Sequence, residues 1–253
     1  MVGYENLLAI TYHDGLPIYD SQQIKMKIIN CGGLKMGHSD TLYQTLYEGQ
    51  CPVSKRSSIS WMGFSEEGML VTMDDAGVVQ GFNFKIQQWI PILDLKNKYP
   101  ETFMNVWIVG FMENEMLVIN VPSSCEQPPL SLKSLYKREK LCVPLLSSDS
   151  QQSKLDEQMI REQFLIDHEQ YRKDLWEPLK HFRGRYEPEK VLSSSILDAK
   201  EMIQKKKEFD KTILGHVKLC IENDEHEKIF TYLDLMNFKP SIKLALKLAN
   251  AYK

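Results

Sequence analysis

The stretch ISWMGFSEEGMLVTMDDAGVVQGFNFKIQQWIPILD, residues Ile59–Asp94, decides the fold. It contains four short runs rich in aromatic and β-branched residues, which favour a pleated, half-buried surface. Acidic residues precede Gly68 and Gly77 in the turns, where glycine supplies the positive φ of tight hairpins. Four antiparallel strands in about forty residues is the size of a propeller blade. The stretch therefore predicts one blade of a β-propeller.

The large aromatic residues of this region are expected to fill the space between neighbouring blades, because each ring buries much apolar area. They are Trp61, Phe64, Trp89 and, further along the chain, Trp107. We assign them to packing and not to ligand binding.

Strand patterns continue upstream of this stretch. Ile24, Met26 and Ile28 alternate with polar residues, which is the period of a strand with one solvated face. Strand-like runs also occupy Glu5–Tyr12 and Thr41–Tyr47. A glycine-containing loop at Cys31–Asp40 precedes the second of these runs. The upstream residues are therefore expected to belong to another blade.

Downstream, the apolar runs Asn105–Met112 and Glu115–Val121 predict a hairpin. The basic segment Lys133–Lys140 is interpreted as irregular, and Leu141–Leu146 as one possible last strand. At most about ten strands result, too few for the four or more blades that a closed propeller needs. We therefore expect residues 1–146 to be the late blades of an incomplete β-propeller, completed by further sequence or by a partner chain.

A polar linker at residues 147–153 separates this part from residues 154–253, where the apolar period changes from two to about 3.6. The predicted helices begin at Lys154 and after the possible caps Ser193–Ser195. An inter-helix connection is expected over Asp174–Glu189. This part is interpreted as an α-helical bundle, truncated because the sequence stops within a helical pattern.

Two more helices are predicted near the C-terminus. Asp224 and Glu227 have the spacing of a capping box, and Pro240 suits a first helical turn. We expect the two helices to form an antiparallel hairpin with close axes, because small residues lie along the second helix. These are Ala245, Ala249 and Ala251.

Composition excludes several classes of protein. Of the 253 residues, 43% are hydrophobic and 26% charged, as in ordinary folded proteins. The longest apolar runs are too short to cross a bilayer, and the N-terminus lacks the pattern of a signal peptide. A net charge of −3 gives no global attraction to nucleic acid, so any DNA contact would be local.

Five cysteines are scattered along the chain without a CxxC pair, which predicts reduced thiols in the cytosol or nucleus. They are Cys31, Cys51, Cys125, Cys142 and Cys220. The histidines do not accompany them at the spacing of zinc ligands.

Candidate catalytic groups are isolated. His13-Asp14 and His38 with Asp40 are typical of turns, and His226 lies among carboxylates that are interpreted as solvated caps. The basic run Lys205–Lys207 is interpreted as a solvated helix face, with a weak phosphate-binding role as the alternative. The sequence therefore predicts no catalytic, cofactor or metal site, and the chain is not expected to be an enzyme. Hydrolysis using His13 or His226 is the least favoured hypothesis.

Several short strings resemble a known family. They are Trp61-Met62-Gly63-Phe64-Ser65, Asp75-x-Gly77-Val78-Val79, Trp89-x-Pro91-Ile92 and Val106-Trp107-x-Val109-Gly110, followed by Leu233-x-Leu235-Met236 and Ile242-x-Leu244-Ala245-x-x-Leu248-Ala249. In this order they resemble the replisome-hub adaptor family with a SepB-type propeller and helical bundle, which includes acidic nucleoplasmic DNA-binding protein and chromosome transmission fidelity protein. The chain looks like a C-terminal fragment that lacks the first blades and the last bundle helices.

The resemblance implies a non-enzymatic adaptor of the nuclear replication fork. Such an adaptor trimerises through its propeller and captures short helical peptides of GINS, a part of the replicative helicase, and of DNA polymerase alpha. The predicted partner-binding residues lie on the last helical hairpin and are Tyr232, Leu235, Met236, Leu244 and Leu248. The alternative is a generic propeller-plus-helix scaffold of another assembly, such as a coat or transport complex.

Overall fold

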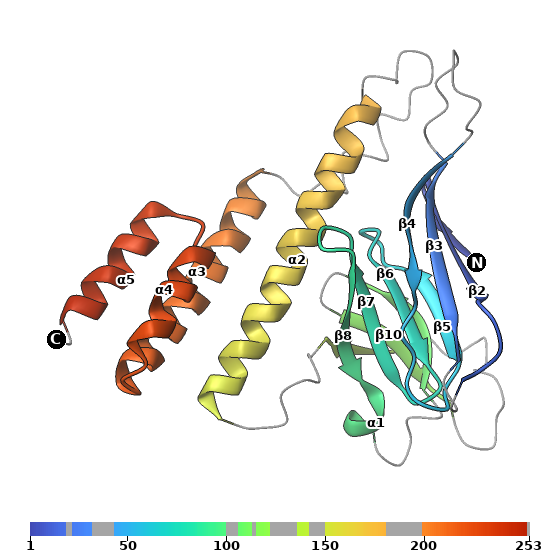
Figure 1. Ribbon diagram of the computed structural model, residues 1–253, viewed down its shortest axis with the longest axis horizontal. Helices are drawn as coiled ribbons and strands as arrows, with labels where there is room; N and C mark the ends of the chain where they lie inside the picture. The colour runs from blue at the N-terminus through green and yellow to red at the C-terminus, as the bar shows by residue number, and fades with distance from the viewer. Residues whose placement is uncertain are drawn as a thin grey trace. The chain divides into compact units, whose positions relative to one another are not determined.

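Antiparallel strands and long helices occupy separate parts of the chain in the computed structural model (Figure 1). The chain divides into a sheet unit, Met1–Pro144, and a helical unit, Leu145–Lys253. The structure describes residues 1–18, 22–31, 43–99, 106–112, 115–121, 136–141, 150–180 and 199–251.

The stretch predicted to be a blade forms one four-stranded antiparallel sheet, which confirms its four predicted strands. Its strands follow one another in sequence order and are β5 (Ile59–Phe64), β6 (Leu70–Asp74), β7 (Val78–Asn83) and β8 (Gln88–Asp94). A short helix, α1 (Leu95–Lys98), follows β8 and is capped by the carboxylate of Asp94.

The two glycine turns of this sheet have the conformation that their sequence predicts. Gly68 and Gly77 have φ values of 85° and 87°. A Cβ on Gly68 would also lie 2.6 Å from the ring of Tyr4, which leaves no room for a larger residue. In the second turn, the carboxylate of Asp74 accepts hydrogen bonds from the backbone N–H groups of Ser54 and Val78.

The upstream residues form a second four-stranded sheet, again in sequence order. Its strands are β1 (Val2–Tyr4), β2 (Leu7–His13), β3 (Ile24–Asn30) and β4 (Gln44–Gln50). The alternation predicted for β3 is confirmed, since Ile24, Met26 and Ile28 are buried. β1 has no counterpart in the prediction, because three residues are too few to show a period.

A third sheet has the order β11-β10-β9. Its strands are β9 (Val106–Phe111), β10 (Glu115–Asn120) and β11 (Tyr136–Lys140). The hairpin of β9 and β10 is confirmed. The interpretation of Lys133–Lys140 as irregular is wrong, because β11 pairs with β10 along its whole length. Most of Leu141–Leu146 and of Cys31–Asp40 lies outside the described residues.

The first strands of the three sheets lie next to one another. β5 contacts β1 on one side and β9 on the other. Tyr4 of β1 stacks on Phe64, and Phe111 of β9 packs against Trp61. A propeller arranges such sheets around a central channel, but the eleven strands of the described residues do not close a ring.

One of the four large aromatic residues departs from its predicted place. Trp61, Phe64 and Trp89 are at least half-buried. Trp107, predicted to be core, has 48% of its surface exposed. The reason is the pleat of β9: Val106 and Ile108 point inward, so Trp107 between them points outward.

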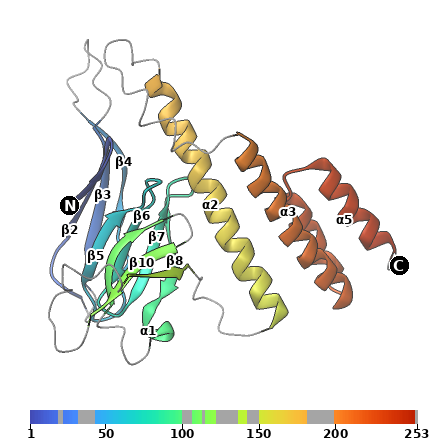
Figure 2. The same ribbon diagram turned by 180° about the vertical axis from the view of Figure 1, so that it is seen from behind.

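The helical unit begins with two long helices (Figure 2). They are α2 (Gln151–Lys180) and α3 (Ala199–Glu222). α2 starts three residues before the predicted Lys154, and it continues into the predicted connection Asp174–Glu189. Pro178 thus lies within a helix, because one proline removes one backbone donor without obliging the helix to end there. The predicted caps Ser193–Ser195 lie outside the described residues.

Two shorter helices complete the described part of this unit, α4 (His226–Leu235) and α5 (Lys239–Ala251). Pro240 lies in the first turn of α5, as predicted. The capping box is wrong: Asp224 has φ 60°, and Glu225 occupies the cap position without a side-chain hydrogen bond. A residue with positive φ belongs to the preceding turn and cannot occupy the usual N-cap conformation.

α3 is the centre of the helical core and packs against α2, α4 and α5. Its buried stripe contains Phe209, Ile213 and Val217, which meet Ile229 of α4 and Ala245 of α5. The small residue Ala245 is fully buried in this core. Both short helices pack on α3 and make few contacts with each other, so the predicted antiparallel hairpin with close helix axes is wrong.

Candidate partner-binding surface

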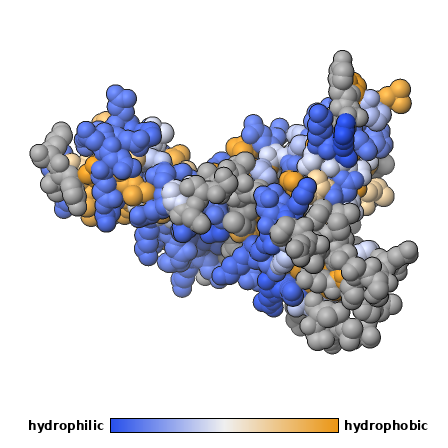
Figure 3. Space-filling view, turned by 90° about the horizontal axis from the view of Figure 1, so that it is seen from below, coloured by the Kyte–Doolittle hydropathy of each residue, from blue (hydrophilic) through white to orange (hydrophobic). Residues whose placement is uncertain are grey.

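Large apolar side chains remain exposed on the last two helices. Their exposed fractions run from 43% to 69%, whereas apolar residues of this size are usually buried. They are Phe230 and Leu235 on α4, and Leu244 and Leu246 on α5. Figure 3 shows hydrophobic side chains among hydrophilic ones near the C-terminal end of the helical unit. We refer to these four residues together as the exposed apolar surface, although Leu244 and Leu246, two positions apart on one helix, point in different directions.

The five residues predicted to bind a partner fall into two groups. Leu235 and Leu244 belong to the exposed apolar surface. Tyr232 and Leu248 are partly buried against the helical core. Met236 is only 8% exposed and belongs to the core, so little of its side chain is available to a partner. Sequence reasoning missed Phe230 and Leu246, although both lie outside the inner apolar stripe.

A buried carboxylate fixes the connection between α4 and α5. The Asp210 side chain on α3 accepts hydrogen bonds from the backbone N–H of Asn237 at 2.8 Å and of Phe238 at 3.1 Å. Without this acceptor, both donors would lack a partner among the described residues. Asp210 therefore holds the two helices that carry the exposed apolar surface at a defined separation.

A second polar contact joins α2, α3 and α4. His216 is fully buried, and its ring stacks on Tyr232 with centroids 4.7 Å apart. Its Nδ1 lies 3.3 Å from the Gln152 amide nitrogen and 3.6 Å from an Asp156 oxygen. Tyr232 is thus held in place by packing, and partial burial raises the pKa of its hydroxyl.

The residues considered for catalysis are not assembled into a site. His13 is exposed at the end of β2, and Asp14 pairs with Lys25 at 2.6 Å. His226 contacts the Asp224 carboxylate at 2.9 Å on the surface. Across the ranges that the structure describes, no three His, Cys, Asp or Glu side chains meet in a group suited to a metal. His38 and Asp40 lie outside these ranges.

The two basic clusters have different surroundings. Lys207 on α3 is exposed, whereas Lys205 and Lys206 are half-buried. In β11, Arg138 lies 3.8 Å from Glu115, and Glu139 pairs with Lys98 at 2.7 Å. Part of each cluster is therefore already neutralised or covered.

Three of the cysteines can be placed. Cys31 is exposed, and Cys51 and Cys220 are buried; all three are free thiols. Burial raises the pKa of Cys51 to about 12, so this thiol is not a nucleophile at neutral pH. Cys125 and Cys142 lie outside the described residues.

The class of protein follows from these observations: antiparallel, blade-like sheets in sequence order, followed by helices that expose apolar side chains. Residues 1–145 match the family described as the Minichromosome loss protein, Mcl1, middle region. The match covers more than half of the chain, and the chain belongs to this family. Among its described helices, none has the length and apolarity that a membrane span requires.

The chain is also similar to larger proteins. WD repeat and HMG-box DNA-binding protein 1 of Xenopus laevis is 24% identical over 173 residues, which cover 68% of this chain and 15% of that protein. The human protein of the same name gives the same figures. Protein ENHANCER OF LHP1 1 of Arabidopsis thaliana is 25% identical over 256 residues, covering 100% of this chain and 24% of that protein. The chain thus spans less than a quarter of the length of these relatives.

Proposed function

We propose that this chain is part of a non-enzymatic adaptor of the nuclear DNA replication fork. In this proposal the sheet unit mediates homotrimerisation, and the helical unit binds short helical peptides of GINS and DNA polymerase alpha. The observation that carries the proposal is the family match over residues 1–145. Similarity to proteins named for WD repeats and a DNA-binding HMG box supports it.

The exposed apolar surface supports the peptide-binding part. A client helix binds through apolar residues spaced three or four positions apart, which lie along one of its faces. Leu244 and Leu248 are also four positions apart, so they are neighbours along α5. Because the contacts of one such peptide are few, a trimer would strengthen binding through effective concentration.

A fluorescence titration tests this part. Labelled peptides from GINS and DNA polymerase alpha are titrated with the full chain and with the variants Leu235→Asp and Leu244→Asp. We expect saturable binding that each variant weakens at least ~10-fold, because a carboxylate would be buried in an apolar contact. Ile203→Asp is the matched control: Ile203 is also an exposed apolar residue, but lies near the start of α3.

Two outcomes would contradict the peptide-binding part of the proposal. Absence of saturable binding by the folded chain argues against the proposal. Equal losses for Leu235→Asp, Leu244→Asp and the Ile203→Asp control would place the peptide elsewhere. Circular dichroism of each variant verifies that the helices remain folded.

Sedimentation equilibrium tests the trimer. The chain has a mass of 29.4 kDa, so a homotrimer sediments with three times this mass. A monomer at all concentrations would contradict trimerisation by this chain.

We extend the proposal to a weak contact with DNA through the basic residues near Lys207. A filter-binding assay would detect it as an affinity that falls steeply as the salt concentration rises.

A further inference from the structure

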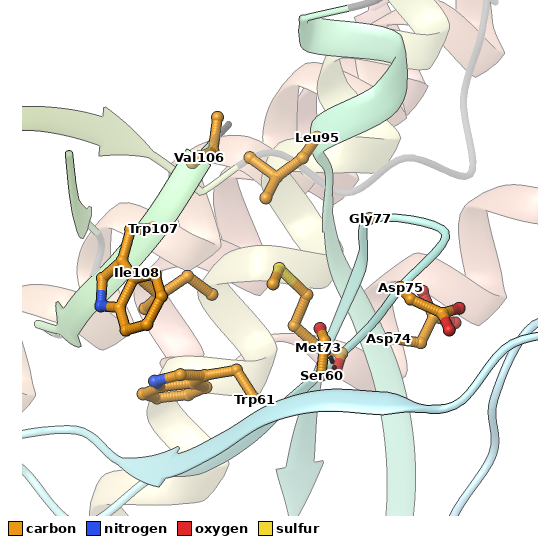
Figure 4. A pocket seen from close by; sticks show the side chains of 10 residues that line it. All are labelled: Ser60, Trp61, Met73, Asp74, Asp75, Gly77, Leu95, Val106, Trp107 and Ile108. Atoms are coloured by element: carbon orange, nitrogen blue, oxygen red, sulfur yellow. Dashed lines mark hydrogen bonds between the residues drawn. The ribbon is translucent and has the colours of Figure 1, made fainter. Parts of the chain in front are cut away.

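The sheet unit contains a cavity of about 230 Å³ between the β5–β8 sheet and the β9–β11 sheet. Figure 4 shows its lining, which comes from β5 and β6, from the turn after β6, and from α1 and β9. Two indoles, of Trp61 and Trp107, lie on one side of Met73. Two carboxylates, of Asp74 and Asp75, lie on the other side of Met73 (Figure 4).

The aromatic side of the cavity is accessible. Trp107 is 48% exposed although it is one of the largest apolar side chains of the unit. Trp61 packs against Phe111 at a centroid separation of 5.4 Å, which fixes its position. A fixed indole and an exposed indole thus border the same cavity. Indole faces attract cations and also bury the apolar parts of long side chains.

The two carboxylates differ in their availability. Asp74 is buried, and each of its oxygens accepts a backbone hydrogen bond, from Ser54 and Val78 respectively. Asp75 is exposed, and its carboxylate accepts a hydrogen bond from the Ser58 hydroxyl at 2.9 Å. Partial burial raises the pKa of Asp75, but the hydrogen bonds from Ser57 and Ser58 outweigh it and lower the pKa. Asp75 is therefore charged at neutral pH and retains capacity to accept further hydrogen bonds.

The charge of the lining is one-sided. Among the described residues that line the cavity, aspartates are the only ionisable ones, and none is a lysine or arginine. A cation that enters would therefore meet carboxylates and indole faces and no competing positive charge. An anionic ligand would be repelled.

The size of the cavity restricts the ligand further. Pockets for small molecules usually measure about 300–1,000 Å³, so this cavity is smaller and suits a single long side chain. An apolar stem can lie on the indoles and Met73, with a cationic head near Asp75. Arginine fits better than lysine, because its planar guanidinium can donate two parallel hydrogen bonds to a carboxylate, whereas the lysine ammonium is a point charge.

We propose that the cavity bordered by Trp61, Trp107 and Asp75 binds an arginine side chain of a partner polypeptide. This site lies in the sheet unit and is separate from the exposed apolar surface of the helical unit. It goes beyond the proposed function and does not depend on it: the sheet unit would contribute a second contact, specific for a basic residue.

Nuclear magnetic resonance of the full chain tests the proposal. The probe is the peptide N-acetyl-Gly-Arg-Gly-amide, and the readout is the indole N–H resonance of each tryptophan. We expect saturable shifts for Trp61 and Trp107 and none for Trp89, which does not line the cavity. A peptide with neutral citrulline in place of arginine should bind at least ~5-fold more weakly, because it lacks the charge. A lysine peptide should also bind more weakly.

Three variants complete the test. Asp75→Asn keeps a hydrogen-bond acceptor but removes the charge, and should weaken arginine binding ~5-fold. Trp107→Ala removes an exposed indole and should have a similar effect. The control is Asp14→Asn, which removes an exposed carboxylate at the end of β2. Thermal melting establishes that each variant is folded.

Several results would overturn the proposal. One is the absence of saturable shifts at Trp61 and Trp107. Others are equal binding of the citrulline or lysine peptide, and an Asp14→Asn control that loses as much affinity as Asp75→Asn.

Discussion

Buried polar side chains serve different purposes in the two units. In the sheet unit, Ser65 and Asn83 shape turns close to them in sequence: the Ser65 hydroxyl accepts from the backbone of Glu67 and Met69, and Asn83 accepts from Lys85 and Ile86. Asp74 bonds to Val78 in its own turn and also to Ser54, 20 positions away. In the helical unit they connect different helices. Asp210 reaches residues 27 and 28 positions away, and Thr212 donates to Glu162, 50 positions away.

This difference has a thermodynamic consequence. Loss of a turn contact leaves the pairing of the neighbouring strands in place, so its effect should stay local. Loss of a contact between helices releases one helix from another, so its effect should extend over the unit. The following substitutions test this expectation, from the largest predicted effect to the smallest.

The largest effect is expected for a cavity in either core. Phe82 and Phe209 are fully buried in the sheet unit and the helical unit respectively. Phe82→Ala and Phe209→Ala should each reduce the free energy of unfolding of their own unit by about 3–5 kcal/mol. Urea unfolding followed by amide hydrogen exchange measures this for each unit. A loss below about 1 kcal/mol in either unit would show that its core does not depend on the ring.

The next effect concerns the buried carboxylate of the helical unit. Asp210→Ala should cost about 1–3 kcal/mol or more, because the N–H groups of Asn237 and Phe238 lose their acceptor. Hydrogen exchange should accelerate along α5 as well as at these two amides. Asp234→Ala is the control, since Asp234 is exposed on α4. Acceleration confined to Asn237 and Phe238 would contradict the expected long-range effect.

A smaller and local effect is expected for a turn of the sheet unit. Gly77→Ala places a Cβ on a residue with φ 87° and should lower the free energy of unfolding by about 1–2 kcal/mol. Gly110→Ala is a matched control, because a Cβ there meets nothing within 4 Å. Differential scanning calorimetry compares the two variants. If faster hydrogen exchange spread from the Gly77 turn to the β1–β4 sheet, the sheet unit would not respond locally.

The smallest effect is expected for the ion pair of Lys98 and Glu139. Burial raises the pKa of Glu139, but hydrogen bonds from Lys98 and Tyr99 outweigh it and lower the pKa. The ion pair therefore stabilises the fold above about pH 4.3, the pKa of glutamate in the unfolded chain. The stabilisation is lost as the pH falls through the lower pKa of Glu139 in the folded chain.

Lys98→Met should accordingly lower the free energy of unfolding by about 0–1 kcal/mol at pH 7 and by less near pH 3. Urea unfolding at the two pH values measures the difference. Lys96→Met on the same helix is the control, because Lys96 is exposed. A cost that is the same at both pH values would show that packing of the lysine stem, and not charge, is responsible.

Sequence patterns predicted the sheets better than the helical contacts, for a physical reason. A glycine turn such as Asp74–Gly77 and the alternation in β3 depend on residues close in sequence, so both were visible. β11 was missed because YKREK contains almost no apolar residue. Its pairing comes from backbone hydrogen bonds at a sheet edge, where charged side chains are common.

The candidate surface was predicted only in part. Leu235 and Leu244 could be placed outside the inner stripe from helical periodicity. Met236 could not, because it follows the last residue of α4 and the path of the chain there depends on Asp210. A contact across 27 residues leaves no pattern in the sequence, and neither does the cavity between Trp61 and Trp107, whose residues come from separate sheets.

Strand β5 has a consequence for how reliably the chain folds. Trp61 and Phe64 are three positions apart, so they point to opposite faces of the sheet, one toward Phe111 and the other toward Tyr4. A slip of β5 by one residue would exchange these faces and remove both contacts together. Misaligned pairing of β5 with β6 would therefore lose stabilising contacts with both neighbouring sheets. The contacts on the two faces of β5 thus help to select the correct register.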